Sequence, residues 1–208
     1  MATNTTPTKT DSVTVLSHQA ATHPTTIVGS AIDCRTKVSA LVFLYHGYVE
    51  ATADTNPGRF LIQVRPDDGA GSVNEHWITV FRGRAQGTTP DTEAMTATEP
   101  VGETVLAVAS TTGFVVEDEL YIQNSTLADS EWATCDVVTS NTSVTLIDGL
   151  TTQQTSSSVI WNDASRWVIP LDLSDCESFR VVWQHRGATG ANGHVKAFAV
   201  TYDSDTSA

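Results

Sequence analysis

Short runs of alternating apolar and polar residues, separated by turn residues, extend along almost the whole chain. Threonine and serine account for 32 and 18 of the 208 residues, and valine and isoleucine fill many apolar positions. β-branched side chains are stiff at χ1 and fit a pleated sheet better than a helix. No stretch of ten or more residues has a convincing helical period. The pattern therefore predicts an all-β protein of the sandwich or barrel type.

Residues 101–161 resemble a separate β module set inside a second β domain. We therefore predict a flexible N-terminal arm at residues 1–11, a discontinuous β-sandwich formed by 12–98 and 163–208, and an inserted small β-barrel-like module at 99–162. The polar segment 83–98 would be the entry linker. The module's strands are expected at Val101–Phe114, Glu119–Gln123, Glu131–Val138, Ser143–Ile147 and Ser158–Trp161.

The remaining strands of the sandwich are expected on both sides of the module. Lys37–Glu50 is apolar on both faces, which is typical of a strand buried between two layers. With Arg59–Arg65 it would form a hairpin. The other expected strands are Ser12–Leu16, Thr25–Ile32, Val73–Arg82, Arg166–Leu173, Phe179–His185 and His194–Asp203.

Charge and hydropathy exclude several functional classes. The formal net charge is -13, which opposes binding to a nucleic-acid backbone. The longest apolar run, Ala40–Tyr45, is too short to cross a bilayer. Because the N-terminus lacks the pattern of a secretory signal, we expect synthesis in the cytoplasm. Eight of the eleven basic residues are arginine, which tolerates burial in protein interfaces.

The residue types that carry chemistry do not form a recognisable motif. The histidines show no HxH or HExxH spacing and are expected in the core or at strand edges, although strand pairing could bring His46, His76 and His185 together. The cysteines show no CxxC spacing and are expected as free thiols. The full sets are His18, His23, His46, His76, His185 and His194, and Cys34, Cys135 and Cys176.

Acidic clusters and tryptophans leave two alternatives open. The clusters Asp67–Asp68, Glu117–Glu119 and Asp203–Asp205 fall in turns or in the tail, and a weak calcium site at Asp67–Asp68 or at a subunit contact is one alternative. The tryptophans are expected as core or interface anchors, with a sugar-binding surface as the other alternative. We predict no catalytic, cofactor-binding or metal site. The tryptophans are Trp77, Trp132, Trp161, Trp167 and Trp183.

Several segments of the chain resemble virion proteins of tailed bacteriophages. The similar segments within Glu99–Ser158 are a GETVLAVASTTGF opening, a DELYI strand, a SEW strand and a SVTLIDGL segment, at Gly102–Phe114, Asp118–Ile122, Ser130–Trp132 and Ser143–Leu150. In the sandwich, Leu171–Ser174 followed by Phe179–Val182, and Lys37–Glu50 before Arg59–Arg65, look like the same family. The resemblance implies a capsid-associated or decoration role without catalytic residues.

These observations lead to one functional expectation and three alternatives. We expect a non-enzymatic phage particle protein that binds the lattice of the major capsid protein, associates with itself on the head surface of the virion, and binds neither nucleic acid nor membrane. It would be made in the cytoplasm of the bacterial host. The alternatives are a neck, tail-tube or fibre-base component, a carbohydrate-binding module and, third, a virion-bound glycan depolymerase.

Overall fold

The computed structural model of the protein describes residues 8–22, 24–50, 57–66, 76–85, 90–186 and 192–203. Strands dominate throughout, and the helical content of these residues is a single 3-10 turn at Leu127–Asp129. The all-β prediction is confirmed. In the same part of the chain, no helix is long and apolar enough to cross a membrane.

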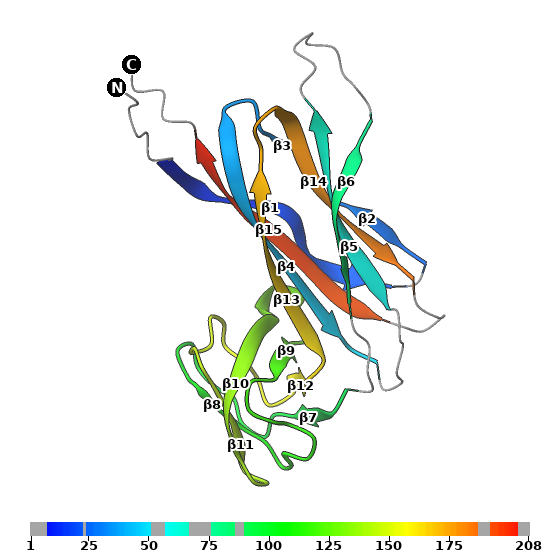
Figure 1. The fold of residues 1–208 in the computed structure, drawn as a ribbon. Helices are drawn as coiled ribbons and strands as arrows, with labels where there is room; N and C mark the ends of the chain where they lie inside the picture. Colours follow the sequence, from blue (N-terminus) through cyan, green and yellow to red (C-terminus); the bar gives the residue numbers. More distant parts are fainter. Residues whose placement is uncertain are drawn as a thin grey trace.

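The sandwich consists of two antiparallel sheets. The first sheet has the order β1-β15-β4-β13, and the second has the order β2-β14-β5-β6, with β3 also paired to β14 (Figure 1). These strands are β1 (Thr8–Ala21), β2 (Thr26–Val28), β3 (Ile32–Asp33), β4 (Lys37–Tyr48), β5 (Gly58–Pro66), β6 (Ile78–Arg84), β13 (Ala164–Asp172), β14 (Cys176–His185) and β15 (Gly193–Asp203).

The strand order identifies the sandwich as a jelly roll. When β2 and β3 are counted as one strand because both pair with β14, eight strands remain in chain order. The first sheet then has the order 1-8-3-6 and the second 2-7-4-5. Every connection passes from one sheet to the other except the one between β5 and β6, which is the arrangement of a double-sheet jelly roll.

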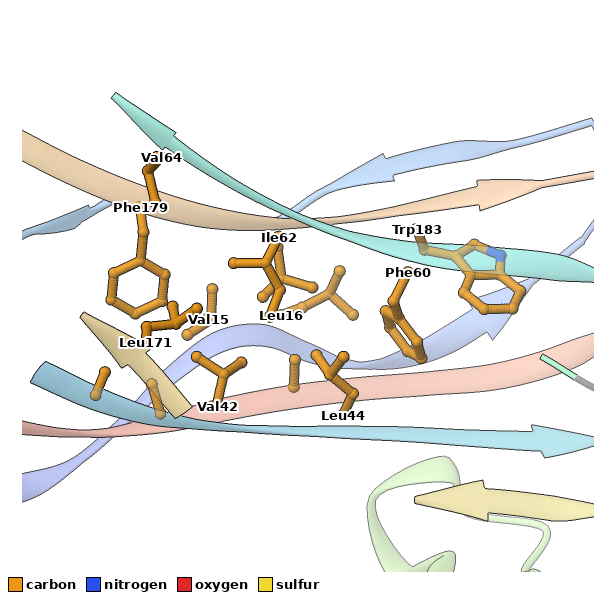
Figure 2. Packing of buried hydrophobic residues seen from close by; sticks show 14 of the residues in the cluster. Val15, Leu16, Val42, Leu44, Phe60, Ile62, Val64, Leu171, Phe179 and Trp183 are labelled. Carbon is orange, nitrogen blue, oxygen red and sulfur yellow. The ribbon is translucent and has the colours of Figure 1, made fainter. Parts of the chain in front are cut away.

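The core of the sandwich lies between the two sheets. Alternate residues of β4, such as Val42 and Leu44, point towards alternate residues of β5 and β14, such as Phe60 and Trp183 (Figure 2). The period of two between buried residues is that of a strand with one face on a core. Further buried members of this cluster are Val15, Leu16, Ile62, Val64, Phe179, Val181, Val195, Ala197 and Ala199.

The module is inserted between β6 and β13, which are edge strands of the two sheets. Its six strands have the order β7-β12-β9-β10-β11-β8. An isolated bridge between Met95 and Val108 brings the two ends of this row together, and the Thr96 amide donates to the Ala107 carbonyl at 2.8 Å. This closure makes the module barrel-like, as predicted. The strands are β7 (Thr92–Ala94), β8 (Val105–Ala107), β9 (Glu119–Gln123), β10 (Glu131–Thr139), β11 (Ser143–Leu146) and β12 (Val159–Trp161).

The module has a hydrophobic cluster of its own, distinct from that of the sandwich. Its members lie on the inner side of the barrel and contribute no residue to the cluster between the two sheets. They are Met95, Leu106, Val108, Phe114, Leu120, Ile122, Cys135, Val144, Leu146, Leu150 and Ile160. A separate core is what a self-contained unit requires.

Two predictions about β4 are wrong. Lys37–Glu50 does not form a hairpin with Arg59–Arg65, because β4 pairs with β15 and β13 while β5 pairs with β14 and β6 in the other sheet. The two strands meet face to face across the core instead. Nor is β4 covered on both faces: Val42 is buried, whereas Phe43 on the opposite face is only half-buried. The apolar residues on that second face belong to the outer surface of the sandwich.

Two boundaries also differ from the prediction. β1 begins at Thr8, which pairs with Asp203, so residues 8–11 of the predicted flexible arm belong to the first sheet. Residues 1–7 lie outside the described part. The predicted entry linker 83–98 contains β7, which pairs with β12 in the sheet of the module. Short polar strands of this kind lack the alternation that marks longer ones.

Candidate functional site

Aromatic side chains join the module to one end of the sandwich. Tyr121 of β9 is fully buried, its ring stacks on His194 at 5.0 Å, and its hydroxyl shares a 3.1 Å hydrogen bond with Nε2 of His18. Trp132 of β10 lies 4.8 Å from the His18 ring and 5.5 Å from the Tyr45 ring. We call these five residues the junction. Burial raises the pKa of Tyr121 well above its ordinary value, so its hydroxyl stays protonated.

The backbones of the two parts approach closely at the junction. A Cβ atom at Gly47 of β4 would lie 2.5 Å from Cγ of Tyr121, so this position has room only for glycine. An ion pair reinforces the contact, because Nε of Arg166 in β13 lies 2.5 Å from Oε2 of Glu119 in β9. Arg166 also donates to the Thr134 hydroxyl. These contacts fix the module's orientation on the sandwich.

The outer side of the first sheet is apolar and continues from the junction. Successive cross-strand rows place Phe43 between Phe198 and Val168, and Leu41 between Val200 and Pro170. The Phe43 and Phe198 rings are stacked at 4.6 Å, and Tyr45 lies 5.8 Å from Phe198. Val168 is 54% exposed. We call this surface the aromatic face; it comprises Leu41, Phe43, Tyr45, Val168, Pro170, Phe198 and Val200.

Three histidines, His18, His46 and His194, lie at or next to the junction. His46 is buried against the Trp183 ring at 4.9 Å, and neither of its ring nitrogens has a hydrogen-bond partner among the described residues. Burial, followed by His194 and His185, lowers the pKa of His46 to about 3. Burial lowers the pKa of His18 and of His194 to about 4. These three imidazoles are therefore neutral at pH 7.

Of the three histidines that strand pairing could bring together, His46 and His185 interact electrostatically. His185 ends β14 and acts electrostatically on His46, whereas His76 precedes β6 and belongs to no strand. His23 lies outside the described residues. Within the described ranges, no group of three or more His, Cys, Asp or Glu side chains is placed to hold a metal ion.

The described acidic residues have local structural roles. The Asp118 carboxylate accepts a hydrogen bond from the Val115 amide at 2.8 Å, Glu119 pairs with Arg166, and Asp203 pairs with Lys37. Glu117 lies in a turn with a φ of 72°. The Asp67–Asp68 pair considered for calcium and residues 204–205 lie outside the described part of the chain.

All five tryptophans have partners that account for their positions, and the guanidinium carbon of Arg180 lies 4.1 Å from the centre of the Trp77 ring. Trp183 is in the core and Trp167 packs edge-on against Phe60 at 5.8 Å. Trp132 belongs to the junction, and Nε1 of Trp161 donates to Oε1 of Gln123 at 2.9 Å. Because Trp132 is packed among junction rings, it is not a free platform for a sugar.

The cysteines are free thiols. Cys34 and Cys135 are buried, and burial raises their pKa values to about 12 and about 11. A thiol rather than a thiolate is the stable form at neutral pH, which leaves both side chains unreactive.

The sequence alone indicated only part of this arrangement. It drew attention to Trp132, His18 and His194 by residue type, but not to Tyr45, Tyr121 or Gly47. Tyr121 lies in an alternating run like any other strand residue. The importance of its side chain becomes evident only when the structure places the module against β4. The apolar outer positions of β4 were the available signal for the aromatic face.

Comparisons with known proteins assign no family to the chain. No known family and no curated protein matches it. Among solved structures, it is similar to the SPBc2 prophage-derived protein YomS, at 11% identity and a TM-score of 0.31, over 98% of this chain and 100% of that chain. With TM-scores below 0.5, this likeness and those that follow transfer no function.

Two further similar structures are viral. One is VP2 of infectious bursal disease virus in a subviral particle, at 11% identity and a TM-score of 0.24, with 95% of this chain and 41% of that chain covered. The other is VP17, a capsid protein of bacteriophage P23-77, at 7% identity and a TM-score of 0.17, with 95% and 99% covered.

Proposed function

We propose that the protein is a non-enzymatic structural component of a virus particle, which binds and reinforces the outer capsid surface as a head decoration protein. The observation that carries the proposal is the aromatic face. The sandwich already has a closed core, yet one outer side of it presents stacked phenylalanines and an exposed valine. Contiguous exposed apolar surface of this kind marks a protein contact.

The architecture supports the same proposal. Double-sheet jelly rolls occur in viral capsid proteins, although lectins and cupins share them, so the fold alone assigns no role. The module is clamped to the sandwich by the junction and by the Arg166–Glu119 ion pair. An attachment surface on the sandwich and a rigidly held projection suit a protein that binds a lattice and displays a module.

The proposed mechanism is mechanical reinforcement. A copy bound across neighbouring capsid subunits adds contacts that shell rupture must also break, and attachment at several points multiplies weak individual interfaces. The net charge of -13 would make decorated particles repel one another. No turnover of substrate enters this mechanism.

Particles that lack the protein provide the test. Added protein should bind saturably and raise the temperature of DNA release, because a ligand that binds the intact shell better than the ruptured one stabilises it by mass action. Val168→Asp, on the aromatic face, should weaken binding at least about tenfold because burying an unpaired carboxylate is costly.

A matched control is available on the other sheet. Val28 of β2 is 55% exposed, almost the same as Val168, but lies away from the aromatic face. Val28→Asp should leave binding within about twofold of the unchanged protein. An unchanged release temperature at full occupancy would contradict the decoration role and favour the neck or tail alternative.

A further inference from the structure

Four arginines line one pocket on the second sheet. They are Arg59 of β5, Arg82 and Arg84 of β6, and Arg186 just after β14, and the pocket has a volume of about 280 Å³. Arg59 and Arg84 are cross-strand partners. Half of the chain's eight arginines therefore converge at one place in a protein whose net charge is -13. We call this the arginine pocket.

Among the described residues, Arg59 is oriented without being neutralised. Oε1 of Gln184 accepts hydrogen bonds from two nitrogens of Arg59, at 3.0 and 2.8 Å. A neutral amide fixes the guanidinium but leaves its charge uncompensated. Among the described residues, no carboxylate pairs with Arg59, Arg82 or Arg186.

A second pocket of the protein shows the opposite arrangement. Its arginines are each paired with an acid: Arg35 lies 2.5 Å from Asp33, and Arg65 lies 2.8 Å from Glu177. In the arginine pocket, by contrast, burial and then the charges of Arg186 and Arg82 lower the pKa of Arg59. Like charges held this close together are stabilised by a bound anion.

We propose that the arginine pocket binds clustered carboxylates of an acidic protein segment. Planar guanidinium groups bind carboxylates through paired hydrogen bonds, and several of them arranged around one pocket suit a segment with neighbouring Asp or Glu residues. A nucleic acid is disfavoured because its long phosphate backbone would meet the rest of an acidic surface. The inference goes beyond the decoration role, and it is tested on the purified protein without particles.

The experiment measures binding of a fluorescently labelled peptide of six Asp and Glu residues by anisotropy at low salt. The double substitution R82Q/R186Q removes two exposed charges of the pocket and should weaken binding at least about tenfold. R82K/R186K keeps the charges but loses the planar guanidinium, and should weaken binding several-fold. Affinity should fall with added salt because the contact is ionic.

The control R35Q/K196Q removes the same number of charges outside the arginine pocket, from two exposed side chains. It should change the affinity less than about twofold. Equal weakening by both double glutamine substitutions would overturn the proposal, since binding would then follow net charge alone. No binding at low salt, or tighter arginine-dependent binding of a single-stranded DNA oligonucleotide than of the peptide, would also overturn it.

Discussion

Gly47 and Tyr121 come from different parts of the molecule but occupy one contact. The missing side chain of Gly47 makes room for the Tyr121 ring, and a Cβ atom would lie 2.5 Å from it. The junction therefore depends on a small residue in β4 as much as on the aromatic residues of the module. Neither residue is conspicuous in the sequence.

Gly47→Ala should lower the free energy of unfolding by about 1–3 kcal/mol, as overpacking of a tight contact usually does. Tyr121→Ala should cost roughly 3–5 kcal/mol because it empties a fully buried aromatic site. In the double variant, the Gly47→Ala penalty should become smaller, since the contacts with Cγ and Cδ1 are gone and the contact with the retained Cβ atom, at 2.8 Å, remains. Urea unfolding of the four proteins checks this; strictly additive penalties would contradict the contact.

The buried histidines predict how stability depends on pH. His18, His46 and His194 have pKa values of about 4, 3 and 4, against 6.5 for an ordinary histidine. The unfolded chain therefore binds more protons than the folded one below pH 6.5. Their stabilising contribution is complete above that pH and is lost as pH falls towards the folded pKa values.

Urea unfolding should thus show a loss of about 2 kcal/mol or more between pH 7 and pH 4.5, a range above the ordinary pKa of aspartate and glutamate. His46→Phe should reduce this loss, because phenylalanine retains the stacking on Trp183 and takes up no proton. Equal stability at pH 7 and pH 4.5 would contradict the neutral histidines.

At the scale of elements, the alternation of apolar and polar residues predicted well where strands occur but not which strands pair with one another. β14 and β15 lie within a few residues of their predicted bounds, and Phe179, Val181 and Trp183 share the buried face expected for them. The predicted hairpin of β4 and β5 is wrong because a period of two identifies the buried face of a strand but not the sheet to which the strand belongs. β7 escaped prediction because it has three residues and little apolar character.

The module's own core predicts that the sandwich folds without it. Replacing 90–162 by a short Gly-Ser linker should leave a folded protein, because Asp163, which accepts a hydrogen bond from the Tyr48 amide, is retained. The linker would cross between sheets, since β6 and β13 belong to different ones. Circular dichroism and a cooperative thermal transition check this. A molten or insoluble product would contradict the division into two units.

At the scale of the whole molecule, chemically different surfaces occupy different places. The aromatic face lies on the outside of the first sheet, the arginine pocket on the second sheet, and the module at one end, opposite the start of β1 and the end of β15 (Figure 1). Composition together with the pattern of short alternating runs predicted the all-β class and the barrel-like insertion. The sequence did not predict where these surfaces lie. The outward-facing residues of separate strands can be assigned to one surface only when the strand order is known.

The most direct test of the proposed function is the position of the protein on the particle. The proposal implies that a virus encodes the chain, and electron cryomicroscopy, or immunogold labelling with antibody against the module, should be applied to particles of that virus. The decoration role predicts density in regular positions over the head shell, with the first sheet towards the lattice and the module projecting outwards. Density confined to the neck or tail, or particles that lack the protein, would contradict it.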